Sequence, residues 1–339
     1  MATTHSNKIR IAVLGTGHLG SIHTRLWKTA DNAELVGIYE PNPVQAEKVA
    51  GENGVVIFTT LEEAFATVDA VTIASPTLFH YELAVEAIKA GKHCFIEKPI
   101  TATYQEAEKL IALARENSVL VQVGHVERFN PGLAALHNYQ MAPLFIEAHR
   151  LAQFKPRATD VSVVLDLMIH DIDIALSLVK SPVISIDAHG VAVLTETPDI
   201  ANARIRFANG CVANLTASRI SAQPMRKMRL FQKDAYLSID FAKGSVEVYR
   251  ILNEGEQTSS IPAMMLGSID TDDVKKSIVY EQPIAPQVNA IAEEQRAFIN
   301  AILGHSPIAV SAVDAAEALR IAEEVAKAIK REKTTIQSI

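Results

Sequence analysis

The sequence has few cysteines and no excess of positive charge, and each shortage excludes a class of protein. Only Cys94 and Cys211 occur among 339 residues, each inside an apolar segment. We therefore expect reduced core thiols rather than a disulfide or a pair of metal ligands. The formal net charge of −7 offers no basic surface for nucleic acid or for an anionic membrane.

Long apolar runs are also missing. No stretch of about 18 apolar residues could span a bilayer, and residues 1–8 are polar and lack the apolar core of a signal peptide. We expect a cytoplasmic protein that binds neither membrane nor nucleic acid. The length exceeds that of one typical core. We predict two domains, 1–126 and 127–339. The C-terminal helices could pack against the sheet of the second domain or back against the first domain.

The chain begins with a dinucleotide-binding pattern. A strand at 9–14 leads directly into Gly15-Thr16-Gly17-His18-Leu19-Gly20, and a helical pattern follows. In this context Gly15 permits a tight turn, Gly17 lets a pyrophosphate approach the backbone, and Gly20 lets the helix pack closely. The helix N-terminus offers N–H groups to the phosphates. The alternative is a glycine-rich turn without a ligand.

An acidic residue predicts which dinucleotide binds. Glu40 follows the second strand, 34–39, about 20 residues beyond Gly20, where a carboxylate would hold the adenosine ribose hydroxyls. The carboxylate would repel a 2′-phosphate, and the following Pro41-Asn42-Pro43 contains no arginine. NAD is therefore favoured over NADP.

Strands and helices continue to alternate as far as residue 124. The predicted strands are 55–58, 70–74, 94–96 and 120–124, separated by helices at 45–50, 61–65, 80–90 and 104–116. This order indicates an α/β domain, a Rossmann doubly wound parallel sheet. The loop 75–79 follows a strand and should line the cofactor, with Ser75 and Pro76. His80 begins a helix, where a structural histidine is favoured over a catalytic one, and we include it among the residues near the cofactor.

Ligands of open parallel sheets lie at the carboxyl ends of the strands. Glu97, Lys98 and Pro99 occupy that position after the apolar run Cys94 to Ile96. Glutamate and lysine are seldom buried without a partner. The pair therefore indicates either a functional site or a surface ion pair.

Longer, neighbouring strands dominate after residue 144. They are predicted at 144–150, 183–194, 201–207, 212–218, 228–231, 235–240 and 245–249, with a hairpin turn at Asn209-Gly210. We predict an α+β second domain with a large, mostly antiparallel, open-faced sheet. Such a face tends to be buried against another copy, so we expect a homodimer or homotetramer. Residues 253–286 are polar and are predicted to form a long loop or lid, and helices at 288–303 and 312–331 end the chain.

A second group of polar residues interrupts an apolar helix at 163–178. Asp166, His170 and Asp173 fall at i, i+4 and i+7, on one helical face. Asp166 and His170 suit a base and its orienting carboxylate. A metal site and a structural histidine are the alternatives, and two ligands of mixed kind without a third make the metal the weaker one.

These motifs resemble a known family. Gly15-x-Gly17-x-x-Gly20, then Gly91-Lys-His-x-x-x-Glu97-Lys98-Pro99, then Asp166-x-x-x-His170 are similar in order and spacing to the NAD(P)-dependent glucose-fructose oxidoreductase, inositol dehydrogenase and rhizopine catabolism family. The resemblance implies that Lys98 and His170 face a sugar hydroxyl beside C4 of the nicotinamide. It implies that Asp166 supports His170 and that Lys98-Pro99 shapes the nicotinamide pocket. Either Lys98 or His170 could be the base.

The resemblance also bears on the substrate. The linker 123–131 is similar to that of members that oxidise C3 of UDP-N-acetylglucosamine or its uronate. A diphosphate needs cations, for which the candidates are Lys155, Arg157, Arg128 and Arg219. A free sugar or inositol would instead use hydroxyl-binding residues such as Asp173 and Asn130.

The expected site residues form three sets, and no metal is expected. The catalytic set is Lys98, His170 and Asp166. The cofactor-binding set is Gly15, Thr16, Gly17, His18, Leu19, Gly20, Glu40, Ser75, Pro76, His80, Glu97 and Lys98. The substrate-binding set is Lys98, Arg128, Asn130, Lys155, Arg157, Asp166 and His170. Two further functions are a reductase of a non-sugar carbonyl or tetrapyrrole and a catalytically silent NAD-binding regulator.

Overall fold

The chain forms two compact units in the computed structural model, which describes residues 8–154, 161–252, 263–271 and 274–336. The first unit comprises Met1–Val126 and Val288–Leu319, and the second comprises Glu127–Gln287 and Arg320–Ile339. We predict a division at 126/127 from the sequence, and the structure additionally assigns residues 288–319 to the first unit.

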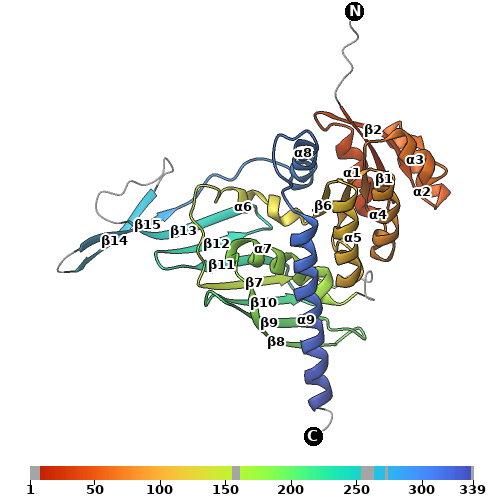
Figure 1. Cartoon of the computed structure of the whole chain (residues 1–339). Helices are drawn as coiled ribbons and strands as arrows, with labels where there is room; N and C mark the ends of the chain where they lie inside the picture. The colour runs from red at the N-terminus through yellow and green to blue at the C-terminus, as the bar shows by residue number, and fades with distance from the viewer. Residues whose placement is uncertain (1–7, 155–160, 253–262, 272–273, 337–339) are drawn as a thin grey trace, which may run out of the picture. The chain divides into compact units, whose positions relative to one another are not determined.

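The first unit is built on a six-stranded parallel sheet (Figure 1). Its strand order is β3-β2-β1-β4-β5-β6, so the order reverses between β1 and β4, where open α/β sheets bind their ligands. The strands are β1 (Ile9–Leu14), β2 (Ala33–Tyr39), β3 (Val56–Ile57), β4 (Ala70–Ile73), β5 (His93–Glu97) and β6 (Val121–Gly124). The Rossmann fold predicted from the alternation is confirmed.

Helices connect and cover these strands. They are α1 (His18–Trp27), α2 (Pro43–Asn53), α3 (Leu61–Thr67), the short η1 (Thr77–Phe79), α4 (His80–Lys89) and α5 (Tyr104–Glu116). Local sequence explains their starts: Asn42 accepts hydrogen bonds from two backbone N–H groups of α2, and Thr103 with Glu106 forms a capping box on α5.

A late helix completes the core of the first unit. Phe298 and Ile299 of α8 (Ala290–Ile302) belong to one buried apolar cluster with Ile11 of β1, Trp27 of α1 and Phe95 of β5. Burial of side chains this large contributes roughly 1.5–3 kcal/mol each. This packing explains why residues so late in the chain join the first unit.

The second unit is built on a nine-stranded sheet (Figure 1). Its order is β14-β15-β13-β12-β11-β7-β10-β9-β8, and only β7 and β10 pair in parallel. The strands are β7 (Phe145–Leu151), β8 (Val183–Val191), β9 (Ile200–Phe207), β10 (Val212–Ser218), β11 (Met225–Phe231), β12 (Ala235–Asp240), β13 (Ser245–Leu252), β14 (Ala263–Thr271) and β15 (Val274–Glu281). The predicted large, mostly antiparallel sheet is confirmed.

The two faces of this sheet differ. Along β7, Ile146, Ala148 and Arg150 are buried, while the residues between them are partly exposed. The helices of this part are η2 (Val126–Phe129), α6 (Pro131–Ala134), η3 (Val164–Met168), α7 (Ile169–Val179) and α9 (Ala312–Ile336), whose first residues belong to the first unit. Contacts of α7 with β7 and β10 identify this helix as a cover of the sheet.

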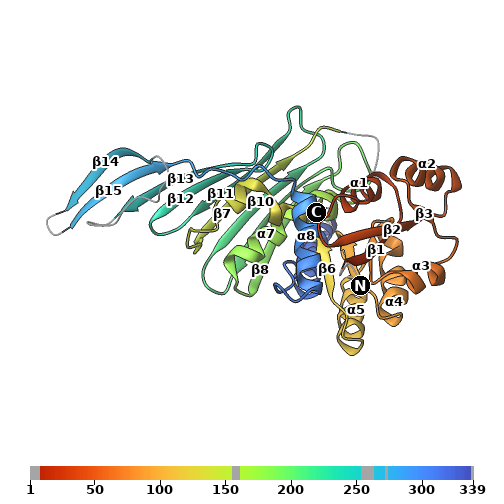
Figure 2. The ribbon, with the colours of Figure 1, turned by 90° about the horizontal axis from the view of Figure 1, so that it is seen from above.

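Two predictions need correction. Part of the segment 253–286, predicted as a loop or lid, forms the β14–β15 hairpin, which extends from the end of the sheet (Figure 2). The sequence did not predict these strands because Met264 and Met265 are both exposed. Buried and polar residues therefore do not alternate along this segment. The helix predicted over 163–178 has a π-helical turn, η3, at its start.

Both cysteines are buried and unpaired with each other, as predicted. Among the described residues, no helix combines the length and the apolar character needed to cross a bilayer.

Candidate active site

The glycine loop lies at the carboxyl end of β1. Gly15 has a φ of +84°, and a Cβ there would lie 2.7 Å from the Ser75 Cα. A Cβ on Gly20 would overlap the Gly15 carbonyl oxygen, so this residue permits the close approach of α1. Gly17 has no neighbour within 4 Å of such a Cβ, and no side chain caps α1. The first N–H groups of α1 thus remain available for a pyrophosphate.

Glu40 lies directly beside this loop. Its Oε2 accepts hydrogen bonds from the Thr16 backbone N–H (2.7 Å) and hydroxyl (3.1 Å), and its Oε1 accepts one from the Asn42 N–H at 3.1 Å. The carboxylate is therefore held in place without a cationic partner among these contacts. It can accept further hydrogen bonds from ribose hydroxyls.

A cavity of about 520 Å³ opens next to Glu40. Its volume lies within the range of small-molecule sites. It is lined by Gly15, Tyr39, Glu40, Pro41, Leu61, Ser75, Pro76, Phe79, Glu82, Leu83 and Glu86. The structure thus brings together four of the predicted cofactor residues, namely Gly15, Glu40, Ser75 and Pro76. These residues fit an adenosine group between apolar walls.

Sequence reasoning did not single out two of the apolar lining residues. Leu61 is the first residue of α3 and Leu83 lies in α4, and helical apolar residues of this kind are normally assigned to the core. Tyr39 and Pro41 could have been found, since they flank Glu40 at the carboxyl end of β2.

His80 connects two segments near the end of the sheet. Its Nδ1 lies 2.9 Å from the Pro99 carbonyl oxygen and its Nε2 lies 2.9 Å from the Ser75 carbonyl oxygen. Burial lowers the pKa of this imidazole. His80 therefore braces the loop after β4 against the cis Lys98-Pro99 segment, and it does not line the cavity described above.

Glu97 ends β5 and Lys98 follows it. Glu97 is only 7% exposed, and its Oε1 accepts a hydrogen bond from His23 Nε2 at 2.7 Å, while its Oε2 accepts the Lys98 backbone N–H at 3.2 Å. Burial opposes the charge on Glu97, but the His23 hydrogen bond and the nearby positive charges lower its pKa overall. This inward contact differs from the surface ion pair considered from the sequence.

In the second unit, Asp166 lies in the π-helical turn η3 and His170 is the second residue of α7. Both side chains are partly exposed on a helix that is otherwise mostly buried. Single π turns inside α-helices are rare and frequently occur at functional sites. The turn alters the helical spacing, so the simple i, i+4, i+7 face does not describe this segment.

The two acidic residues of α7 pair with arginines. Asp173 accepts two hydrogen bonds from Arg128, at 2.8 and 2.6 Å, and Asp171, which sequence reasoning missed, accepts two from Arg150, at 3.0 and 2.8 Å. Arg150 also donates to Glu127 at 2.6 Å. Asp171 could have been found from the sequence, because a charged residue within an apolar helix needs a partner when it is buried.

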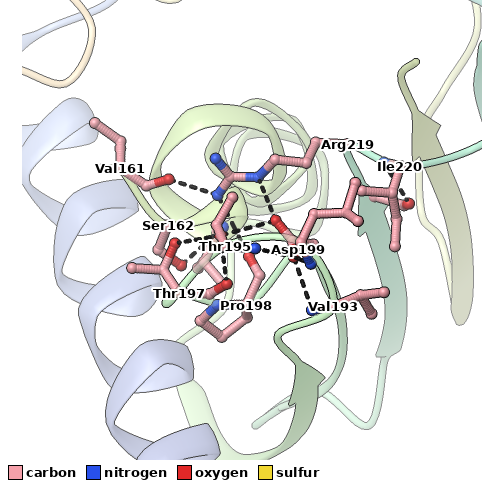
Figure 3. Close-up of polar contacts among 12 residues, drawn as sticks. Val161, Ser162, Val193, Thr195, Thr197, Pro198, Asp199, Arg219 and Ile220 are labelled. Atoms are coloured by element: carbon pink, nitrogen blue, oxygen red, sulfur yellow. Dashed lines mark hydrogen bonds and ion pairs between the residues drawn. The ribbon is translucent and has the colours of Figure 1, made fainter. Parts of the chain in front are cut away.

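Two further candidates have clear positions, and two lie outside the described residues. Asn130 is buried, caps α6, and donates its amide to Glu127 and to the Phe241 carbonyl. Arg219 is also buried, and it donates to the carbonyls of Val161 (2.5 Å) and Pro198 (3.3 Å) beside Asp199 (Figure 3). Lys155 and Arg157 lie outside the described residues.

Comparisons with known proteins agree with this architecture. Residues 9–125 match the oxidoreductase family with an NAD-binding Rossmann fold, GFO_IDH_MocA, and residues 135–247 match the GFO/IDH/MocA C-terminal domain. NAD is thus the cofactor class of the first domain.

Individual relatives extend the similarity over nearly the whole chain. UDP-N-acetylglucosamine 3-dehydrogenase of Acidithiobacillus ferrooxidans is 36% identical over 95% of this chain and 97% of its own length. A solved structure of that enzyme has a TM-score of 0.85, with 34% identity over 96% of this chain and 98% of the other. The scyllo-inositol 2-dehydrogenase (NAD+) of Bacillus subtilis is 30% identical over 63% of this chain and 68% of its own. Together with the glycine loop and its cavity, these similarities establish that the chain belongs to the GFO/IDH/MocA family of oxidoreductases.

Proposed function

We propose that this protein oxidises the C3 hydroxyl of UDP-N-acetylglucosamine. The observation that carries the proposal is the 36% identity with the Acidithiobacillus ferrooxidans enzyme across 97% of that enzyme. Similarity over both units matters because the substrate and the cofactor are expected to use residues from both of them.

Bound NAD supplies the hydride acceptor in this reaction. His170 takes the hydroxyl proton, and Asp166 orients its imidazole and favours its protonated form. Lys98, at the end of β5, donates a hydrogen bond to the developing alkoxide. The partly exposed positions of Asp166 and His170 support these roles, because a group that meets substrate needs access to it.

The polar contacts within the second unit favour a nucleotide sugar over a free sugar. Asn130 and Asp173, the candidates for binding sugar hydroxyls, already serve α6 and Arg128. We propose Lys155 and Arg157 as contacts for the diphosphate. We omit Arg128 and Arg219, because Asp173 and backbone carbonyls respectively occupy their guanidinium groups. An inositol or free-sugar dehydrogenase remains the second candidate, favoured by the similarity to the Bacillus subtilis enzyme.

We further propose that the protein forms a homodimer or homotetramer through the outer face of the nine-stranded sheet. Five aromatic side chains lie on directly paired positions of adjacent strands there, with ring centroids 4.8 to 5.8 Å apart. They are Phe145, Phe231, Tyr236, Tyr249 and Tyr280, which we call the aromatic ladder. Aromatic side chains are enriched in the buried cores of interfaces.

A single-turnover assay tests the proposed reaction. Near-stoichiometric enzyme and NAD are mixed with UDP-N-acetylglucosamine, its uronate, inositols and free hexoses, and NADH absorbance is followed. Single turnover reveals a reaction even when the product stays bound. We expect a burst with a UDP-sugar only.

Substitutions test the roles of individual residues. Lys98→Met and His170→Asn should lower the burst rate roughly 100-fold or more, because each removes a general acid–base or electrostatic contribution. Lys109→Met, a change on α5, is the matched control. A burst with inositol alone would refute the UDP-sugar proposal in favour of an inositol dehydrogenase. Full activity of both variants would overturn the roles assigned to Lys98 and His170.

A further inference from the structure

A buried polar cluster lies within the first unit, next to the end of β5. It contains His23 of α1, Glu97 of β5, and Glu294 with Gln295 of α8. One side-chain atom from each of His23, Glu97 and Glu294 lies within 4.8 Å of the others. His23 and Glu294 are completely buried, and so is Gln295. The reaction described above assigns no task to Glu294.

The hydrogen bonds determine where the His23 proton lies. Gln295 Nε2 is 3.0 Å from His23 Nδ1 and 3.3 Å from the His23 backbone carbonyl oxygen. A carbonyl oxygen only accepts, so the nitrogen end of the amide faces it, and Nδ1 must accept as well. His23 Nε2 then carries the proton and donates it to Glu97 at 2.7 Å.

Glu294 differs from its neighbours because neither carboxyl oxygen has a hydrogen-bond partner among the described residues. The charge that acts on it is that of Glu97, which is negative. The titratable groups that act on Glu97 in turn are His23, Lys98 and His80. A second carboxylate without a cation would be very costly in this buried position.

Either a proton or a metal ion could neutralise the cluster. Two ligand atoms that are each about 2.1 Å from one tetrahedral ion lie roughly 3.4 Å apart. The His23–Glu97 distance of 2.7 Å is instead that of a hydrogen bond, and both His23 nitrogens are already engaged. The geometry thus favours a proton.

We propose that Glu294 is a permanently protonated glutamic acid, which leaves Glu97 as the single anion of the cluster formed by His23, Glu97 and Glu294. This inference rests on the proposed function in one respect, the role of Lys98 at the substrate hydroxyl. With Glu294 neutral, the cluster carries the single negative charge of Glu97, which interacts electrostatically with Lys98.

Two further observations support this arrangement. A Cβ on Gly124 would lie 3.2 Å from three atoms of the Glu97 carboxyl group, so the neighbouring strand β6 leaves room for that group. Burial raises the pKa of Glu294 well above its ordinary value, and the charge of Glu97 raises it further.

Infrared spectroscopy tests the protonation directly and needs no substrate. A protonated carboxyl group has a C=O stretching band that is separate from carboxylate bands and shifts in deuterium oxide. We expect such a band in the wild-type protein from about pH 6 to about pH 9, well above the ordinary glutamate pKa. Glu294→Gln should remove it. Its absence from the wild-type spectrum would overturn the proposal.

Paired substitutions test the consequence for Lys98. Glu294→Gln mimics the neutral acid and should keep kcat within about twofold and leave the pH profile in place. Glu97→Gln should lower kcat roughly tenfold, because it removes the negative charge that interacts with Lys98 and weakens the hydrogen bond from His23. Glu294→Met, uncharged and of similar size, serves as a second variant if the amide destabilises the protein.

Other results would contradict the proposal. A kcat lowered by Glu294→Gln as much as by Glu97→Gln would show that Glu294 is ionised. Stoichiometric metal in the purified protein, lost in His23→Gln, would show that a cation occupies the cluster instead. If the wild-type enzyme oxidises no sugar, the proposed function fails, while the infrared band still decides the protonation of Glu294.

Discussion

At the scale of single residues, the contact between the Glu40 carboxylate and the glycine loop bears on which cofactor binds. The Thr16 backbone N–H and the Asn42 N–H hold the two oxygens, so the side chain cannot swing aside when a larger ligand enters. A fixed negative charge in this position disfavours a 2′-phosphate by Coulomb repulsion. We therefore expect the same residue to select the dinucleotide as well as to hold the loop.

The first prediction concerns this selection. Glu40→Gln keeps an oxygen for the Thr16 N–H but removes the charge. The preference for NAD over NADP, measured as a ratio of kcat/KM values, should fall about tenfold or more, equivalent to about 1.4 kcal/mol. Glu62→Gln, at an exposed position of α3, is the control. An unchanged ratio would mean that Glu40 acts only on the loop.

At the scale of elements, Asp199 joins β8 to β9. Its carboxylate accepts hydrogen bonds from the backbone N–H groups of Val193, Leu194 and Thr195, and it lies beside Arg219 (Figure 3). Burial alone would raise the pKa of this carboxyl, but the backbone N–H groups and the Thr195 hydroxyl lower it to about 2. The charged form therefore stabilises the folded state.

The second prediction follows from that pKa. An ordinary value of 3.8 falls to about 2, which at about 1.4 kcal/mol per pKa unit contributes about 2 kcal/mol. Because the folded pKa is the lower one, this contribution is complete above about pH 4 and is lost as the pH falls through about 2.

Asp199→Asn should lower the free energy of unfolding by about 2 kcal/mol at neutral pH, and the difference from wild type should shrink in acid. Urea unfolding between about pH 2 and about pH 7 measures it. Asp187→Asn, on partly exposed β8, is the control. A constant difference at every pH would contradict the role of the charge.

At the scale of the whole molecule, the second unit presents a face that the chain itself covers only in part. The aromatic ladder crosses β7, β11, β12, β13 and β15, and its rings contact one another in sequence. Cross-strand aromatic pairs each contribute roughly 0.2–1 kcal/mol to a sheet. A ladder on the outer face can also pair with the ladder of a second copy.

The third prediction is that Tyr249→Glu separates the copies. Tyr249 lies between Tyr236 and Tyr280, with ring centroids 5.6 and 4.8 Å away. A charge in a buried apolar interface has no partner and should lower the association constant about 100-fold or more. Size-exclusion chromatography with light scattering measures the mass. Tyr81→Glu, on α4, is the control, and a monomeric wild-type protein would refute the interface.

Local patterns were enough to predict the Rossmann unit. Strand and helix alternate over short distances, and Gly15, Gly17 and Gly20 meet a steric need that no other residue type meets. Glu40 could be assigned because its position after β2 depends only on that unit. The chain alone therefore determined the cofactor and the family resemblance.

Contacts between residues far apart in the chain determine the features that the sequence did not predict. No local pattern indicates that α8 packs in the core of the first unit or that Glu294 lies beside Glu97. These contacts join residues far apart in the chain, and they form only when the elements pack together. Arg219 and Asn130 have the same chemistry whether they bind a ligand or brace a loop. Only their contacts with backbone carbonyls, which the tertiary structure creates, distinguish the two uses.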